Sequence, residues 1–370
     1  FCINGLVWPN REPHPAMYEF KKIAQPVHAD AIDLENGKLE LFNRRYFANL
    51  EDILLEWRLE IDGTAVQKGT IKTLKANPRN KMQIRLNFKK PEVLSGQEVY
   101  LYLCYILKKP CKWAESGHKF GWDQFRIKEF EKKSVQTTFA SHNNLLPNIT
   151  KSQKYLKIES DQGSLSFESN SGRLKQISFH DREFLASSPK LNVWRAPTDN
   201  DGVKAWIGNE EKNSSNLISV STLHKWLNLG LDKLKLTNQI CKVSKDYKCL
   251  NSANKNAQKQ KRFLSLDKNL KNSILQIEVK HQYSCGSISN AFLHYIYWHI
   301  FPDLTIWMEN KVVVHEKLND LPRIGISFQL QEGFEEFKWF GNGPHESYCD
   351  RSAGVRVGCF NSTVNDQYVP

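Results

Sequence analysis

Two acid-rich runs contain the residues whose types and spacing could do chemistry. Residues 194–202 read WRAPTDNDG and contain Asp199 and Asp201, and residues 339–351 read WFGNGPHESYCDR and contain Glu346 and Asp350. A hydrolase needs a pair of positioned carboxylates, or a nucleophile with an oriented base. Each run is therefore a candidate for acid-base chemistry.

Both runs also have a structural interpretation, which their spacing favours. Residues 194–202 lack the alternating ligand spacing and terminal Glu of a calcium loop, so an Asx-rich turn that caps backbone amides is the better interpretation. In the second run, Glu346, Asp350 and Arg351 are more typical of a structural ion-pair and turn network than of a catalytic dyad.

The remaining reactive residue types form no recognisable site. His14, His118 and His345 each adjoin Pro or Gly and have no Ser or Cys partner at a known spacing, and no GxSxG, P-loop or GxGxxG run is present. Eight cysteines are scattered without a CxxC pair, which argues against a zinc site and a disulfide framework. Reduced, mostly buried thiols predict a cytoplasmic location, although three Asn-X-Ser/Thr sequons point the other way. The residues alone do not predict an enzyme.

Length and charge limit the class of protein. A chain of 370 residues with 40% hydrophobic residues predicts two or three packed domains. No stretch approaches the roughly 20 apolar residues that cross a bilayer, so no membrane partner is expected. The net charge of +12 is concentrated in residues 242–271. Because this stretch lacks interleaved aromatic residues, it predicts a solvated loop and no nucleic-acid partner.

Hydrophobic periodicity predicts the elements that must position these runs. Proline residues flank apolar Met17, Phe20 and Ile23 at helical spacing, which predicts one short amphipathic helix. From about residue 36 the period changes to two, with strands expected at residues 55–61, 82–88, 99–107, 275–283 and 324–330. The chain is therefore predicted to be all-β.

Both ends of the chain resemble internal cuts. It begins on Phe1 without an initiator Met and closes on residues 366–370, an apolar stretch that is typical of the entry to a further strand. The sequence therefore predicts that functional residues lie outside it.

Several motifs resemble those of glycoside hydrolase family 2 β-galactosidases of the large bacterial type. Residues 1–15, FCINGLVWPNREPHP, resemble the end of the catalytic barrel, and residues 117–126 resemble the exit from the immunoglobulin-like fourth domain. Residues 194–201, 321–325 and 339–346 resemble successive signatures of the large C-terminal sandwich. These matches occur in order over most of the chain, and only residues 203–290 match poorly.

The resemblance implies three parts. Residues 1–27 would be a remnant of a TIM barrel, residues 28–133 an immunoglobulin-like β-sandwich, and residues 134–370 a larger β-sandwich that is incomplete at its C-terminal end.

The resemblance also implies a retaining mechanism with two Glu residues roughly 5 Å apart. Both would belong to the barrel upstream of Phe1, as would the magnesium ligands, so this chain would have no catalytic residue. Phe1 would line the galactose pocket and offer its main-chain carbonyl to a sodium ion, and Asn4 would give a side-chain oxygen to the same ion. The expected partners are a galactoside-type carbohydrate and further copies of the complete protein in a homo-oligomer.

Some positions depart from the family. Asp201 and Gly202 match the start of a mobile loop with Gly as hinge, but the family inserts an apolar residue between them. Cys349 stands where Pro is usual, and Asn342 where a basic residue is common. The family's aromatic sugar platform would lie beyond Pro370.

Three hypotheses follow from the sequence. The first is the non-catalytic C-terminal portion of a β-galactosidase-like glycoside hydrolase, inactive alone, which supports the barrel and lines the sugar and sodium site. The second is an inactive β-galactosidase relative that acts as a structural or carbohydrate-binding scaffold. Nucleic-acid binding is the third and the weakest.

Overall fold

The computed structural model describes residues 5–94, 96–130, 147–202, 221–244, 275–301 and 303–367. The chain divides into two compact units, the first made of Phe1–Val135 with Glu335–Pro370 and the second of Gln136–Phe334. Antiparallel sheets dominate both units, which confirms the predicted all-β class. The described residues of the predicted barrel remnant form a loop and one helix, and their assignment to a barrel stays a prediction.

In the first unit, the described residues form two sheets, a hairpin and three short helical segments. Its elements are α1 (Pro15–Ile23), β1 (Val27–Asp33), β2 (Lys38–Asn43), β3 (Ile53–Ile61), β4 (Thr64–Ile71), β5 (Lys81–Arg85), β6 (Val99–Leu107), β7 (Lys119–Arg126), η1 (Lys128–Phe130), β19 (Glu336–Gly343), β20 (Arg356–Thr363) and η7 (Asn365–Gln367).

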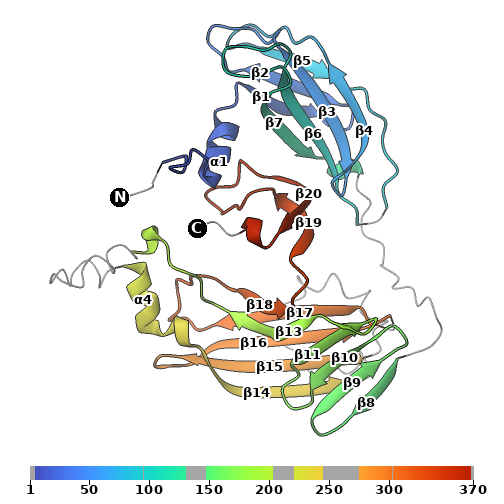
Figure 1. Ribbon diagram of the computed structural model, residues 1–370, viewed down its shortest axis with the longest axis vertical. Coiled ribbons are helices and arrows are strands. Elements are labelled where there is room, and N and C mark those ends of the chain that lie inside the picture. Colours follow the sequence, from blue (N-terminus) through green and yellow to red (C-terminus); the bar gives the residue numbers. More distant parts are fainter. Residues whose placement is uncertain are drawn as a thin grey trace, which may run out of the picture. The chain divides into compact units, whose positions relative to one another are not determined.

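Seven of these strands form an immunoglobulin-like sandwich. One sheet has the order β1-β2-β5 and the other β4-β3-β6-β7, and the two can be followed in Figure 1. Leu39 and Leu41 of β2 share a buried core with Leu55 and Leu59 of β3. All nine residues of β6 are buried, as the continuous apolar run predicts for a strand covered on both faces.

The turn after β3 follows from its sequence. Asp62 and Gly63 both have positive φ, 47° and 79°, and Ile61 pairs with Thr64. Two left-handed residues match the right-handed twist of the flanking strands, which is why Asp-Gly favours this turn. The strand predicted at residues 55–61 is confirmed as part of β3.

The hairpin β19–β20 packs with the first unit. The Gln124 side chain of β7 donates to the Val357 carbonyl of β20 at 2.7 Å and accepts from its N–H at 2.9 Å. Residues 335–367 therefore lie with the immunoglobulin-like sandwich, although the sequence division assigns them to residues 134–370. The three-part division stays a prediction.

The described residues of the second unit form three sheets and three helical segments. Its elements are β8 (Asn148–Lys151), β9 (Tyr155–Glu159), β10 (Gly163–Glu168), β11 (Leu174–Phe179), β12 (Arg182–Glu183), β13 (Leu185–Asn192), η2 (Asp199–Asp201), α4 (Thr222–Leu229), η3 (Leu231–Lys233), β14 (Lys235–Ser244), β15 (Leu275–Cys285), β16 (Ile288–Ile300), β17 (Ile306–Val314) and β18 (Gly325–Leu330).

Two of its sheets enclose the main core of this unit. The five-stranded sheet has the order β12-β11-β10-β9-β8 and the four-stranded sheet the order β14-β15-β16-β17 (Figure 1). Ile158 and Leu165 of the first sheet pack with Ile277 and Ile296 of the second. The strands predicted at residues 275–283 and 324–330 correspond to β15 and β18.

A second cluster in this unit surrounds helix α4, which the sequence analysis missed. Its Trp226 packs with Phe292 of β16. The Ser221 hydroxyl accepts from the His224 N–H at 3.2 Å at the start of the helix, and Gly230 closes it in the left-handed conformation. A Ser cap and a Gly stop on either side of eight helical residues are the signal that could have revealed it.

The cysteines are more exposed than the sequence predicts. Of the six free cysteines among the described residues, Cys104 and Cys285 are buried, but Cys111, Cys349 and Cys359 are exposed, so the expectation of mostly buried thiols is wrong.

Most of the basic stretch 242–271 lies outside the described residues. In the described part of the chain, no helix is both long enough and apolar enough to cross a bilayer.

Candidate functional site

The predicted sugar and sodium ligands, Phe1 and Asn4, lie outside the described residues. The segment that follows them is described and closes on itself. The His14 N–H donates to the Leu6 carbonyl at 3.0 Å, and Val7 and Pro13 form an antiparallel bridge. His14 directly precedes α1, so the loop that begins at residue 5 leads straight into the helix.

The run at residues 194–202 is a turn organised by one carboxylate. Asp201 is buried and receives two bonds from the Arg195 guanidinium, at 2.6 Å and 3.0 Å. The same carboxylate accepts from the Thr198 N–H at 2.7 Å and from its hydroxyl at 3.0 Å. The bond from the Thr198 N–H confirms for Asp201 the predicted turn in which an acidic side chain caps a backbone amide.

The ionisation of Asp201 follows from these partners. Burial alone raises the pKa of its carboxyl, but the bonds from Arg195 and Thr198 outweigh burial and hold the pKa below its usual value. The Arg195 guanidinium also donates to the Pro322 carbonyl at 3.0 Å and lies 5.0 Å from the Trp226 ring centre. Asp201 is therefore a charged structural anchor and not a free general acid.

Gly202 has a backbone that only glycine adopts easily. Its φ is +96°, and an added Cβ would lie 2.4 Å from the Cβ of Ser221, the residue that caps α4. The structure therefore explains a glycine here by space and conformation. Its role as a hinge stays a prediction.

The second acid-rich run forms the ion pair that the sequence favours. Glu346 bonds to Arg351 at 2.5 Å, and the backbones of Tyr348 and Arg351 form a bridge between them. Asp350 is exposed. The structural interpretation is thus confirmed for Glu346 and Arg351.

This loop also contacts helix α1, which the sequence analysis did not predict. The Glu19 carboxylate accepts from the N–H groups of Ala353 and Gly354, at 2.9 Å and 2.5 Å. The Tyr18 ring stacks on His345 with 3.6 Å between ring centres and 17° between planes. Glu19 stands 334 residues from its partner, so only the folded chain reveals the pair.

A second carboxylate missed by the sequence analysis is Asp123 of β7. It is buried and accepts from Lys22 at 2.6 Å, the Tyr105 hydroxyl at 2.7 Å and the Ala29 N–H at 2.9 Å. Burial alone raises its pKa, but the bonds from His28 and Lys22 outweigh that effect, so the pKa lies below the usual value. The sequence signal that could have revealed this residue is an acidic side chain at an inward-facing position of an alternating strand.

Among the described residues of the second unit, three histidines are buried. His281 and His294 pair across β15 and β16, and His294 bonds to the Asn310 side chain at 2.9 Å. His299 contacts the Gln276 amide at 2.8 Å, and burial lowers the pKa of His299 to about 4. Burial also lowers the pKa values of His281 and His294. These neutral rings are part of the packed interior.

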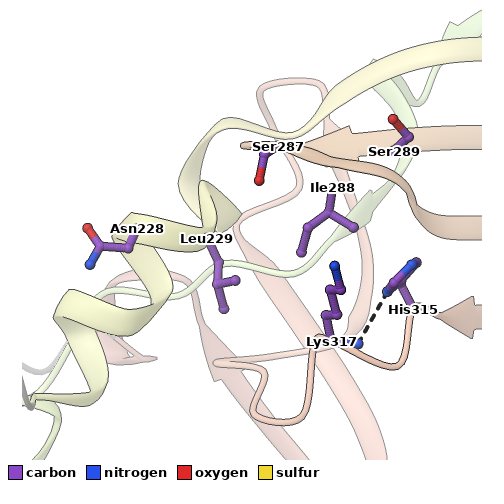
Figure 2. Close-up of a pocket in the computed structure, with 7 residues that line it drawn as sticks. All are labelled: Asn228, Leu229, Ser287, Ile288, Ser289, His315 and Lys317. Carbon is purple, nitrogen blue, oxygen red and sulfur yellow. Dashed lines mark hydrogen bonds between the residues drawn. The ribbon is translucent and has the colours of Figure 1, made fainter.

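An open hollow of about 380 Å³ lies beside the end of α4. Figure 2 shows Leu229 and Ile288 turned toward its middle, while Asn228 and Ser289 turn away. His315 accepts from the backbone N–H of Lys317 at 3.2 Å. The polar groups do not converge, so the hollow has no evident chemistry.

Within the described ranges, no group of three or more His, Cys, Asp or Glu side chains could hold a metal ion. The predicted sodium site depends on Phe1 and Asn4, which lie outside those ranges.

Comparisons with known proteins match the whole chain. The family "Beta galactosidase small chain" matches residues 159–370, and "Beta-galactosidase, domain 4" matches residues 39–128. A Beta-galactosidase of Priestia megaterium is 25% identical over 375 residues, covering 100% of this chain and 31% of the relative. A Beta-galactosidase of Vibrio cholerae is 27% identical over 370 residues, covering 100% of this chain and 32% of the relative.

The chain thus spans about a third of the length of the curated relatives that it matches. The small-chain match begins in β9 and continues through β20, and the domain 4 match covers most of the immunoglobulin-like sandwich. Each of the two predicted sandwiches therefore overlaps a matched β-galactosidase family. The chain belongs to the β-galactosidase small-chain family.

Proposed function

We propose that this chain is the supporting, non-catalytic portion of a β-galactosidase-like glycoside hydrolase that cleaves terminal β-D-galactosides. In this proposal Phe1 and Asn4 border the sugar and hold a sodium ion, Phe1 through its main-chain carbonyl. A hard monovalent cation favours such neutral oxygen ligands. The two sandwich units support the barrel and take part in contacts between copies of the complete protein.

The observation that carries this proposal is that the whole of this chain matches β-galactosidases, of which it covers about a third. The structural use of the acidic candidates supports it. Asp201 is bound to Arg195, and Glu346 to Arg351, so neither is presented as a free catalytic carboxylate.

Turnover of a chromogenic β-galactoside tests the non-catalytic role. We expect the 370-residue chain to show no hydrolysis above the uncatalysed rate, because the two Glu residues of the family mechanism would lie in the barrel. The complete polypeptide should hydrolyse the same substrate. Measurable turnover by the 370 residues alone would contradict the proposal.

Sodium dependence tests the proposed ligands. In the complete polypeptide, Asn4→Ala should raise the sodium concentration for half-maximal activity, whereas Asn77→Ala, at an exposed position, should not. An unchanged sodium requirement in Asn4→Ala would remove this residue from the site. If the complete polypeptide is folded but inactive, the scaffold hypothesis replaces the enzyme.

A further inference from the structure

Three neighbouring loops at one end of the immunoglobulin-like sandwich expose large aromatic side chains. The loops are residues 44–52, 72–80 and 108–118, which join β2 to β3, β4 to β5 and β6 to β7. Tyr46 is 70% exposed, Trp113 is 66% exposed and Phe47 is 100% exposed, and we call these three residues the aromatic patch. Contact between large rings and water is unfavourable, so such a group on a protein surface indicates an interaction site.

Hydrogen bonds hold the loops in a defined arrangement. The side-chain amide of the buried Asn43 donates to the Ala48 carbonyl at 2.9 Å and to the Ala76 carbonyl at 3.1 Å, which ties the first loop to the second. The Arg45 guanidinium bonds to the Asp52 carboxylate at 2.6 Å within the first loop. The aromatic patch is therefore preorganised, which lowers the entropic cost of binding a partner.

Arginine side chains connect the rings of this surface. The Arg45 guanidinium lies 5.2 Å from the ring centre of Phe120, and the Trp113 ring packs edge-on against the same Phe120 with 5.7 Å between centres. The Arg79 guanidinium lies 4.8 Å from the ring centre of Tyr46. Aromatic residues and arginine are the types that are enriched in the hot spots of protein interfaces. The composition therefore favours a protein partner.

The charge of the three loops limits the choice of that partner. They contain eight Lys or Arg residues and three acidic residues, and Lys109 and Lys112 beside Trp113 are exposed. The same face of a second copy would carry the same excess of positive charge and would be repelled. The complementary surface is acidic.

The arrangement of the rings does not favour nucleic acid. Single-stranded nucleic acid stacks its bases on the free faces of successive rings. Here the planes of Tyr46 and Phe47 are inclined at 44°, and the guanidinium of Arg79 lies over the Tyr46 ring. Inclined rings favour the insertion of apolar side chains between them.

We propose that the aromatic patch binds an acidic peptide segment of a partner protein, one with aromatic or aliphatic side chains between its carboxylates. The apolar side chains would pack among Tyr46, Phe47 and Trp113, and the carboxylates would pair with Lys109 and Lys112. The rings supply most of the affinity, and the charges steer association. This interaction uses neither sugar nor sodium, so it stands apart from the function proposed above.

Fluorescence anisotropy of the complete polypeptide tests the proposal with a labelled random copolymer of Glu and Tyr. We expect binding that weakens as salt is added. Poly-Glu of equal length lacks rings and should bind roughly tenfold more weakly, and a copolymer of Lys and Tyr should not bind. The proposal is overturned if the Glu–Tyr copolymer does not bind, or if poly-Glu binds equally well.

Phe47→Ser is the most direct variant, because a fully exposed ring contributes little to folding. Affinity for the Glu–Tyr copolymer should fall roughly tenfold, while the urea midpoint stays unchanged. Phe328→Ser makes the same change at a 53% exposed phenylalanine of the second unit and should bind as wild type. Equal affinities of these two variants would show that the aromatic patch is not the binding site.

A double charge reversal, Lys109→Glu with Lys112→Glu, tests the electrostatic part separately. Affinity for the Glu–Tyr copolymer should fall roughly tenfold and lose most of its salt dependence. Lys151→Glu with Lys157→Glu reverses two exposed charges of the second unit and should have little effect. An equal loss in both double variants would contradict a local role for the loops.

Two other anionic ligands are measured in parallel. They are single-stranded oligo-dT and vesicles that contain anionic lipid. If either binds more tightly than the Glu–Tyr copolymer and loses that binding in Phe47→Ser, the aromatic patch serves nucleic acid or a membrane, and the peptide proposal is overturned. Weak binding that is indifferent to Phe47→Ser is expected of a basic protein and leaves the peptide as the ligand.

Discussion

The carboxylate of Asp201 shows how a catalytic-looking residue becomes a structural one. Its four bonds come from Arg195 and Thr198, which stand within six residues of it. An acid that accepts this many donors favours its ionised form, and proton donation is correspondingly unfavourable. The same run of residues could have suggested a metal loop or an acid catalyst by composition alone.

Asp201→Asn should destabilise the second unit by about 2–3 kcal/mol, because a guanidinium with little exposure would lose its charged partner. Urea unfolding measures the loss. Asp181→Asn is the matched control: it makes the same chemical change at an exposed turn residue, where Asn also tolerates the positive φ of 61°. An equal effect in both variants would show that the ion pair contributes nothing.

At the scale of elements, Asp123 is the point where α1, β1, β6 and β7 meet. Lys22 reaches it from the helix, the Ala29 N–H from β1 and the Tyr105 hydroxyl from β6. Each partner satisfies a polar group that would otherwise be buried without a bond. The helix therefore docks by a polar contact, and its apolar Phe20 and Ile23 remain exposed within the described residues.

Asp123→Asn should lower the free energy of unfolding of the first unit by about 3–5 kcal/mol, since it leaves the Lys22 ammonium without its carboxylate. Tyr105→Phe removes one donor and should cost about 1–2 kcal/mol. Asp350→Asn, an exposed change in the same unit, should be neutral in the same urea titration. A smaller loss for Asp123→Asn than for Tyr105→Phe would contradict the central role of this carboxylate.

At the scale of the whole molecule, buried titratable groups make stability depend on pH. Burial lowers the pKa values of His281, His294 and His299 in the second unit, so these rings are neutral when folded but bind protons when unfolded below about pH 6.5. Their stabilising effect is therefore complete above that pH and is lost as the pH falls toward 4. His28 in the first unit has a raised pKa because of its bond with Asp123. Its contribution to stability is therefore present at low pH and is lost as the pH rises.

Thermal unfolding between pH 7.5 and pH 4 should consequently show a falling midpoint for the second unit. His299→Gln should reduce the loss over this range by up to about 3 kcal/mol, because the ring with a pKa of about 4 no longer titrates. His180→Asn, at an exposed position with a positive φ of 48°, should leave the pH dependence unchanged. Equal pH profiles for both variants would show that His299 does not cause the loss of stability at low pH.

Much of the local structure could be predicted because its cause is local. The alternation that ends at Asp62 and Gly63, the continuous apolar β6 and the helix at α1 each follow from neighbouring side chains or backbone preferences. The turn around Asp201 was predictable for the same reason, since its partners lie in the same short run. Helix α4 has caps at both ends but was missed because the resemblance is poor there.

By itself, the sequence determined the all-β class, the immunoglobulin-like sandwich and the membership of a β-galactosidase family. Tertiary structure alone decided that Glu19 meets Gly354 and that Asp123 receives Lys22, across more than 300 and about 100 residues respectively. The physical reason is that periodicity and turn chemistry act between neighbours. A buried carboxylate, in contrast, is defined by whichever distant donors the packed sheets and helix bring to it.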